Sequence, residues 1–154
     1  MKKYDDASWH YNADNFPKHL PASAGATHIG MFFAWIVAND LCSEEHQSQF
    51  EEDIRSLKSK LKTPGRHVFD TMDGQLLDQD LSIMGQQFAE AYFDLINDGE
   101  YLADYFETFE TTDRDGFDVE TFGAYSSEDN WENYDRIAPV LSERFSNWLM
   151  EKKE

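Results

Sequence analysis

The segment from Tyr4 to Tyr11, with the sequence YDDASWHY, places two carboxylates and an imidazole among aromatic side chains. A histidine beside an aspartate can act as a general acid or base, because the carboxylate orients the ring and stabilises its protonated form. The same side chains can instead form a recognition patch, or belong to an anchored arm whose carboxylates face water. We retain Asp5, Asp6 and His10 as candidate site residues and favour the structural interpretation of the arm.

A second group of candidate residues lies between residues 98 and 135, where thirteen acids accompany a single base, Arg114. Acidic side chains interleaved with aromatic ones can form a surface that binds a basic cleft on another protein. A solvated face on two helices and a loop would show the same composition. The residues of this region that we expect to contact a partner are Asp113, Asp115, Asp118, Tyr125, Asp129 and Glu132.

The acids around Gly116 also invite comparison with the calcium-binding loop of an EF-hand. Aligning Gly116 with the glycine of that loop puts Asp113 and Asp115 at two ligand positions. Thr111 and Phe122 then stand where the first and the last carboxylate ligands belong. Two main ligands are therefore missing, and the pattern does not predict calcium binding.

The other reactive side chains lack the spacing of known catalytic or metal-binding motifs. The five histidines are scattered, and no two are spaced as metal ligands on one helix. A single cysteine, Cys42, excludes an intramolecular disulfide and any zinc site built on paired cysteines. Neither a phosphate-binding glycine loop nor a GxSxG nucleophile elbow is present. The sequence therefore predicts no metal, no cofactor and no enzymatic activity.

Charge and composition restrict the class of partner. The chain has 154 residues, a formal net charge of -18 and 40% hydrophobic residues. Such a chain is repelled by nucleic acids and by anionic membranes, and it attracts basic proteins. No run approaches the roughly 20 apolar residues that span a bilayer, and the start MKKYDDASWHY lacks the apolar region of a secretory signal. We expect one soluble, cytoplasmic domain over residues 1–154 with a basic protein partner.

The elements that position these residues are predicted to be helices, which makes the expected fold class all-α with about six helices. Residues 27–41, THIGMFFAWIVANDL, are apolar on nearly every side and predict a buried central helix. Pro139 should kink the last helix or split it near Ile137. Residues 1–24 mix turn formers with aromatics, which predicts an ordered but irregular arm. Residues 117–122 could form a small hairpin.

Four strings of the sequence carry a family resemblance, namely YDDASWHY, FPKHLP, ATHIGMFFAW and DNWENYDRIAPVLSERF. Together they resemble a family of small acidic bacterial proteins known as a domain of unknown function, and the similarity covers most of the chain. The family brings no established catalytic residues to these positions. The resemblance implies an association with bacterial contact-dependent toxin systems, in which small acidic proteins often serve as immunity proteins.

The leading expectation is therefore a binding protein, an immunity protein that occludes the basic active site or groove of a toxin or effector domain. The first alternative is an acidic mimic of nucleic acid, which would compete with DNA for a DNA-binding protein. The second alternative is a small enzyme that uses His10 with Asp5 or Asp6. It requires His10 and a carboxylate to converge in a cleft.

Overall fold

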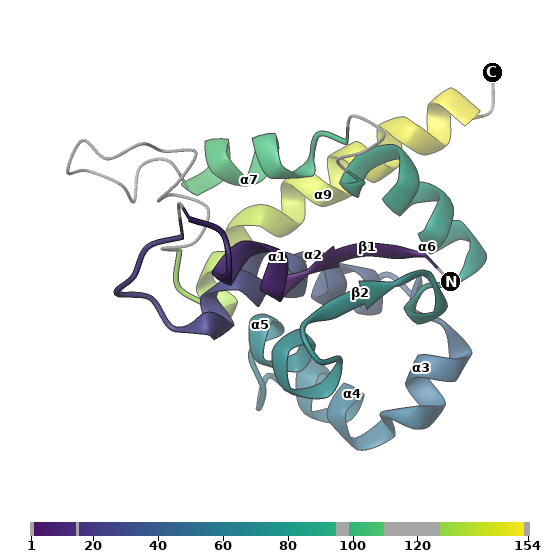
Figure 1. Cartoon of the computed structure of the whole chain (residues 1–154). Coiled ribbons are helices and arrows are strands. Elements are labelled where there is room, and N and C mark those ends of the chain that lie inside the picture. Colours follow the sequence, from purple (N-terminus) through teal and green to yellow (C-terminus); the bar gives the residue numbers. More distant parts are fainter. Residues whose placement is uncertain (1, 15, 95–98, 110–126, 153–154) are drawn as a thin grey trace.

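The computed structural model describes residues 2–14, 16–94, 99–109 and 127–152. Within these ranges the chain is mostly helical and carries a small two-stranded antiparallel sheet, which confirms the predicted all-α class (Figure 1). The hairpin predicted at 117–122 lies outside the described residues. Among the helices that are described, none has both the length and the apolar character needed to cross a membrane.

The described part of the chain forms a series of helices and two strands. They are β1 (Lys3–Asp6), α1 (Ala7–Tyr11), η1 (Ala22–Ala26), α2 (Thr27–Ala38), α3 (Glu44–Gln49), α4 (Glu51–Lys58), α5 (Pro64–Arg66), η2 (His67–Thr71), β2 (Gln75–Leu77), η3 (Asp78–Asp80), α6 (Ile83–Phe88), η4 (Ala89–Phe93), α7 (Tyr101–Phe109) and α9 (Trp131–Lys152). The segments η1 and η3 are 3-10 helices, whereas η2 and η4 are π-helical turns that continue α5 and α6.

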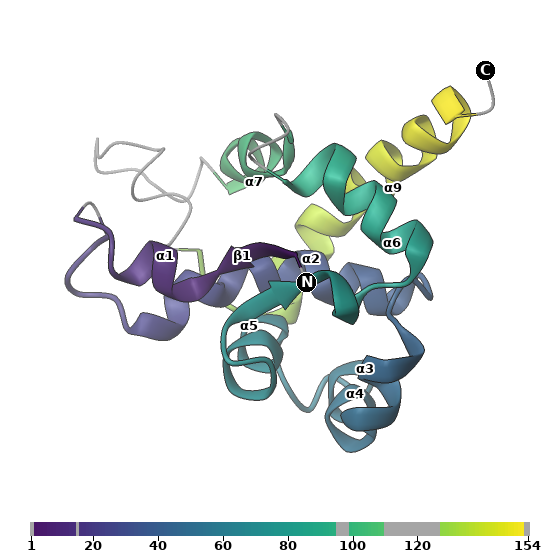
Figure 2. The same cartoon turned by 45° about the vertical axis from the view of Figure 1, so that its right-hand side comes forward.

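Helix α2 is the central helix that the sequence predicts. Ile29, Phe32 and Ile36 are completely buried, and α2 lies between α7 and α9 on one side and α4 and α5 on the other (Figures 1 and 2). The helix ends at Ala38 rather than at Leu41. The Asn39 side chain donates a 2.9 Å hydrogen bond to the Trp35 carbonyl. Asp40 then adopts a left-handed φ of 58°, and a right-handed helix cannot continue through a residue in that conformation.

The N-terminal arm is more regular than predicted. Strand β1 pairs with β2 in antiparallel register, with Asp5 opposite Leu76 and Asp6 opposite Gln75. The Asp6 side chain then caps α1 by accepting a hydrogen bond from the Ser8 amide at 2.9 Å. A four-residue strand has too little periodicity to be recognised, and its partner lies about seventy residues further along the chain. The predicted irregular arm is therefore wrong for residues 3–11.

Helix α9 runs without a break from Trp131 to Lys152, so the predicted split near Ile137 is wrong, while the kink stays a prediction. Ile137 and Leu141, on either side of the proline, are completely buried. Pro139 itself is exposed. A proline has no N–H group to donate to the carbonyl one turn earlier, and on the solvent side of the helix water can bond to that carbonyl instead. Packing of the opposite face holds the helix together across the proline.

The close approach of α2 and α5 depends on a glycine. A Cβ atom at Gly30 would lie 2.3 Å from the carbonyl oxygen of Pro64, which is far inside van der Waals contact. The two backbones therefore touch at this point, and the completely buried Val68 and His67 follow directly on α5.

Candidate functional site

The carboxylate of Asp5 bridges two imidazole rings at the start of the molecule. Its Oδ1 lies 2.7 Å from His10 Nε2, and its Oδ2 lies 2.8 Å from His28 Nε2. The two rings meet edge to face with their centroids 4.4 Å apart. The His28 side chain is completely buried, the Asp5 carboxylate is 6% exposed, and the His10 side chain is 12% exposed. We call these three residues the histidine–aspartate cluster.

Three elements bring the cluster together. The sheet fixes Asp5 on β1, the short helix α1 carries His10, and the first turn of α2 carries His28. Helix α1 can lie against η1 because Gly25 has no side chain, since a Cβ there would come within 2.8 Å of the Ala7 carbonyl oxygen and 3.4 Å of His10 Cβ. The Tyr101 hydroxyl donates to the main-chain carbonyl of His28 and ties α7 to the same place.

The electrostatics of the cluster favour an ionised Asp5 and a neutral His28. Burial opposes the charged form of Asp5, but the His28 ring and the hydrogen bonds from both histidines outweigh it and hold the pKa of Asp5 well below its usual range. Burial lowers the pKa of His28, and this effect exceeds the opposing influence of Asp5. Each Nε2–H group therefore donates to the carboxylate, which accepts a third bond from the Asp6 amide at 2.8 Å.

The structure brings Asp5 and His10 together and separates Asp6 from them. The Asp6 carboxylate is held by Ser8 and by the Lys3 ammonium group at 2.8 Å, so it serves as a helix cap. Sequence reasoning missed His28 as a site residue, because it stands inside a strongly apolar helix and 23 positions from Asp5. The position of a histidine on an otherwise apolar helix was the one signal that could have drawn attention to it.

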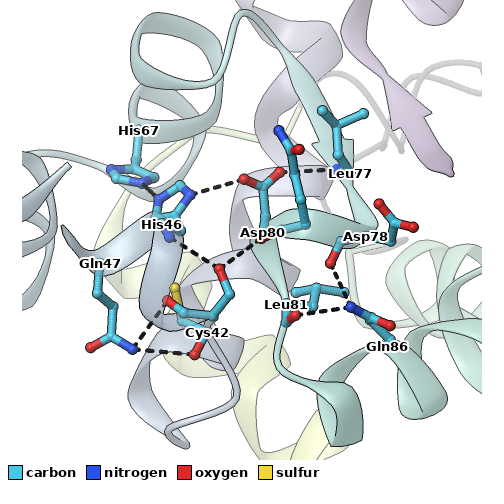
Figure 3. A network of polar contacts seen from close by, with 11 residues as sticks. Cys42, His46, Gln47, His67, Leu77, Asp78, Asp80, Leu81 and Gln86 are labelled. Carbon is cyan, nitrogen blue, oxygen red and sulfur yellow. Dashed lines mark hydrogen bonds and ion pairs between the residues drawn. The ribbon is translucent and has the colours of Figure 1, made fainter. Parts of the chain in front are cut away.

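A second network of buried polar residues lies on the other side of α2, where α3, η2 and η3 meet (Figure 3). His46 Nδ1 lies 3.0 Å from Asp80 Oδ1, and His46 Nε2 lies 3.1 Å from His67 Nε2. Burial, together with His46 and Lys62, lowers the pKa of His67 to about 3. His46 therefore stands between Asp80 and His67 and uses one ring nitrogen for each of them. These contacts link three helical segments and fix the histidine tautomers.

The acidic residues near the start of α9 differ in how far they are engaged by the rest of the protein. Asp129 is half-buried, and its carboxylate accepts hydrogen bonds from the Thr63 hydroxyl and from the amides of Gly65 and Arg66. Glu132 is exposed, as the prediction of a partner contact requires. The other four predicted residues, Asp113, Asp115, Asp118 and Tyr125, lie outside the described part of the chain.

Glu132 is one of three exposed acids on the same face of α9, with Asp135 and Glu143. Their spacings of three and eight residues place them along one stripe of a helix, opposite the buried Ile137 and Leu141. Among the described residues, no base forms an ion pair with any of the three. We call Glu132, Asp135 and Glu143 the acidic stripe.

The bases of α9 are engaged elsewhere. Arg144 forms two hydrogen bonds with the Asp104 carboxylate, at 2.9 and 3.0 Å, and an ion pair with Glu100. Arg136 donates to the Thr108 carbonyl at 2.7 Å, and Lys152 donates to Gln87. Arg136 is exposed and stands four positions from Glu132, so one positive charge accompanies the three negative charges of the acidic stripe.

A family model described as a domain of unknown function, DUF7832, matches residues 3–119. The chain belongs to the DUF7832 family. The curated proteins and the solved structures contain no match to it. The part of the chain that matches DUF7832 contains all three residues of the histidine–aspartate cluster, whereas the acidic stripe lies beyond it.

Proposed function

We propose that this DUF7832 protein is a binding protein, and specifically a bacterial immunity protein that neutralises a toxin or effector domain with a basic active site or groove. The observation that carries the proposal is the acidic stripe, whose three carboxylates are exposed while the bases of α9 are held by other groups. The family resemblance of the sequence to small acidic bacterial proteins supports the immunity role.

The shape of the acidic stripe fits a groove rather than a point contact. Glu132 and Glu143 stand eleven residues apart, which is about 16 Å along a helix that rises about 1.5 Å per residue. Carboxylates over that length can align with a row of lysine or arginine side chains on a partner. Attraction between such rows speeds association and weakens as salt is added.

The binding residues predicted from the sequence contribute to this proposal in different ways. Glu132 belongs to the acidic stripe, and Asp113, Asp115, Asp118 and Tyr125 remain proposed contacts outside the described residues. The carboxylates of Asp5, Asp6 and Asp129 are each engaged inside the protein. These three residues can therefore contribute to binding only indirectly, by stabilising the fold that carries the binding surface.

The proposal is tested by reversing the charge of the acidic stripe. The partner is first captured from a lysate of the source organism at low salt and then purified for direct binding measurements. The triple variant Glu132→Lys, Asp135→Lys and Glu143→Lys should weaken binding at least about 100-fold and flatten its salt dependence. The control variant Asp14→Lys, Glu45→Lys and Glu52→Lys changes the net charge equally, at exposed positions away from the stripe, and should bind nearly as the wild type does.

Neutralisation is measured in cells that express the partner. The wild type and the control variant should suppress its toxicity, and the stripe variant should not. Equal binding by both triple variants would overturn the role of the stripe, and a captured partner without toxicity would overturn the immunity role.

The two alternatives predict different outcomes of the same experiments. A nucleic-acid mimic would compete with DNA for the captured partner. The small-enzyme alternative has the pair that it requires, because His10 Nε2 lies 2.7 Å from Asp5 Oδ1, but only 12% of the His10 side chain is exposed. A His10→Ala variant should still neutralise the partner if the protein acts by occlusion, and it should fail to do so if catalysis at His10 is required.

A further inference from the structure

The histidine–aspartate cluster has a donor set that a transition-metal ion prefers. Two imidazole nitrogens and one carboxylate oxygen converge, and these ligand atoms all lie within 4.8 Å of one another. Ligand atoms about 2.1 Å from a tetrahedral zinc ion are themselves about 3.4 Å apart. Small movements of the Asp5 carboxylate and the His10 ring would therefore give room for an ion at the centre of the cluster.

The surroundings hold the ligands as a metal site requires. Asp5 is fixed by the sheet and by the Asp6 amide, and His28 stands on the most deeply buried helix of the protein. Only His10 approaches the surface, with 12% of its side chain exposed. That edge supplies an entry path and a position for water as a fourth ligand.

The second histidine network, formed by Asp80, His46 and His67, contains the same residue types, but its donor atoms do not point to one common position. In the series from Asp80 to His67, the two nitrogens of His46 point in opposite directions, one to each neighbour (Figure 3). No single point is close to a donor atom of all three residues. In the histidine–aspartate cluster, by contrast, both rings present Nε2 to the same carboxylate.

We infer that Asp5, His10 and His28 form a binding site for one divalent transition-metal ion, of which zinc is the best fit. Two histidines and one carboxylate with an open fourth position are typical of zinc and of related ions that accept nitrogen and oxygen ligands. A ring that coordinates through Nε2 carries its proton at Nδ1, so metal binding replaces the two Nε2–H hydrogen bonds to the carboxylate without removing a proton from either neutral ring. The site is independent of the acidic stripe and of the partner proposed for it.

The test uses the full chain after removal of metal with a chelator. Zinc is titrated by calorimetry, and cobalt is added separately because its visible absorption reports nitrogen and oxygen ligation. We expect one zinc ion per chain, a rise in the melting temperature and a cobalt spectrum typical of a protein site. The His10→Ala and Asp5→Asn variants should each lose at least about 100-fold in zinc affinity, because each removes a direct ligand. Circular dichroism confirms that each variant remains folded.

The exposed His19 provides the matched control, because it is a histidine of the same N-terminal region that lies outside the cluster. The His19→Ala variant should bind zinc as the wild type does. The inference is overturned if the wild type does not bind zinc, or if folded His10→Ala and Asp5→Asn variants keep the wild-type affinity. Those results would leave the cluster as a purely hydrogen-bonded clamp between β1, α1 and α2.

Discussion

The carboxylate of Asp129 holds the amide of Gly65 at 2.7 Å, across 64 positions of the sequence. Its second oxygen accepts from the Thr63 hydroxyl at 2.6 Å and from the Arg66 amide at 3.1 Å. These bonds satisfy the free backbone donors at the start of α5, the segment that touches α2 at Gly30. Asp129 therefore fastens the chain just before α9 to the core of the protein.

Replacement of Asp129 should destabilise the protein. Because the Asp129→Ala variant leaves two amides and a hydroxyl without their acceptor, we expect the free energy of unfolding to fall by about 2–3 kcal/mol. Urea denaturation followed by circular dichroism measures the change. The exposed Glu132 is the control, and Glu132→Ala should change the stability by less than about 0.5 kcal/mol. Equal effects of the two substitutions would contradict the role assigned to Asp129.

The contact between Asp104 and Arg144 should also contribute to stability. Asp104 is 7% exposed, and its carboxylate accepts two hydrogen bonds from Arg144 and one from the Tyr92 hydroxyl. Asp104→Asn removes the charge and one acceptor, which should cost about 2 kcal/mol, since the arginine side remains partly in water. Glu107→Gln, at an exposed position of the same helix, should be nearly neutral in thermal denaturation.

His67 should make the stability depend on pH below neutrality. Its pKa falls from 6.5 to about 3 on folding, chiefly through burial, so the unfolded chain binds one more proton than the native protein between these values. Stability should therefore decrease as the pH is lowered from about 6.5 towards 3, by up to about 1.4 kcal/mol per pH unit from this group. The denaturant midpoint as a function of pH measures this slope.

The variant His67→Gln removes the titrating group and should flatten this part of the pH profile, whereas the exposed His19→Gln should leave it unchanged. A wild-type slope in the His67→Gln variant would show that other groups cause the acid sensitivity.

Cys42 should react slowly in the native protein. Burial and the nearby Asp80 raise the pKa of the thiol to about 12, so very little thiolate is present near pH 8. Modification with a disulfide reagent should be at least about 100-fold slower in the native state than in guanidinium chloride. Cys42 is the only cysteine, so the colour change reports it alone. Similar rates in both states would mean that the thiol is accessible.

The helical architecture was predictable from local patterns. Residues 27–41 are apolar on nearly every side, which predicts a buried helix. The pattern is recognisable because a segment of twelve or more residues repeats the helical period several times. The strand from Lys3 to Asp6 escaped prediction, because a four-residue segment owes its conformation to pairing with β2 rather than to its own sequence. Continuity through Pro139 likewise follows from the packing of Ile137 and Leu141.

The candidate site was likewise predictable from the sequence only in part. Composition by itself determined that the protein is strongly acidic, because net charge does not depend on how the chain folds. Only the tertiary structure decided which acids are exposed, since it engages the Asp129 carboxylate with α5 and leaves Glu132 in solvent. Only the tertiary structure joined Asp5 to His10 and His28, because a site built from three separate elements exists only once β1, α1 and α2 are packed together.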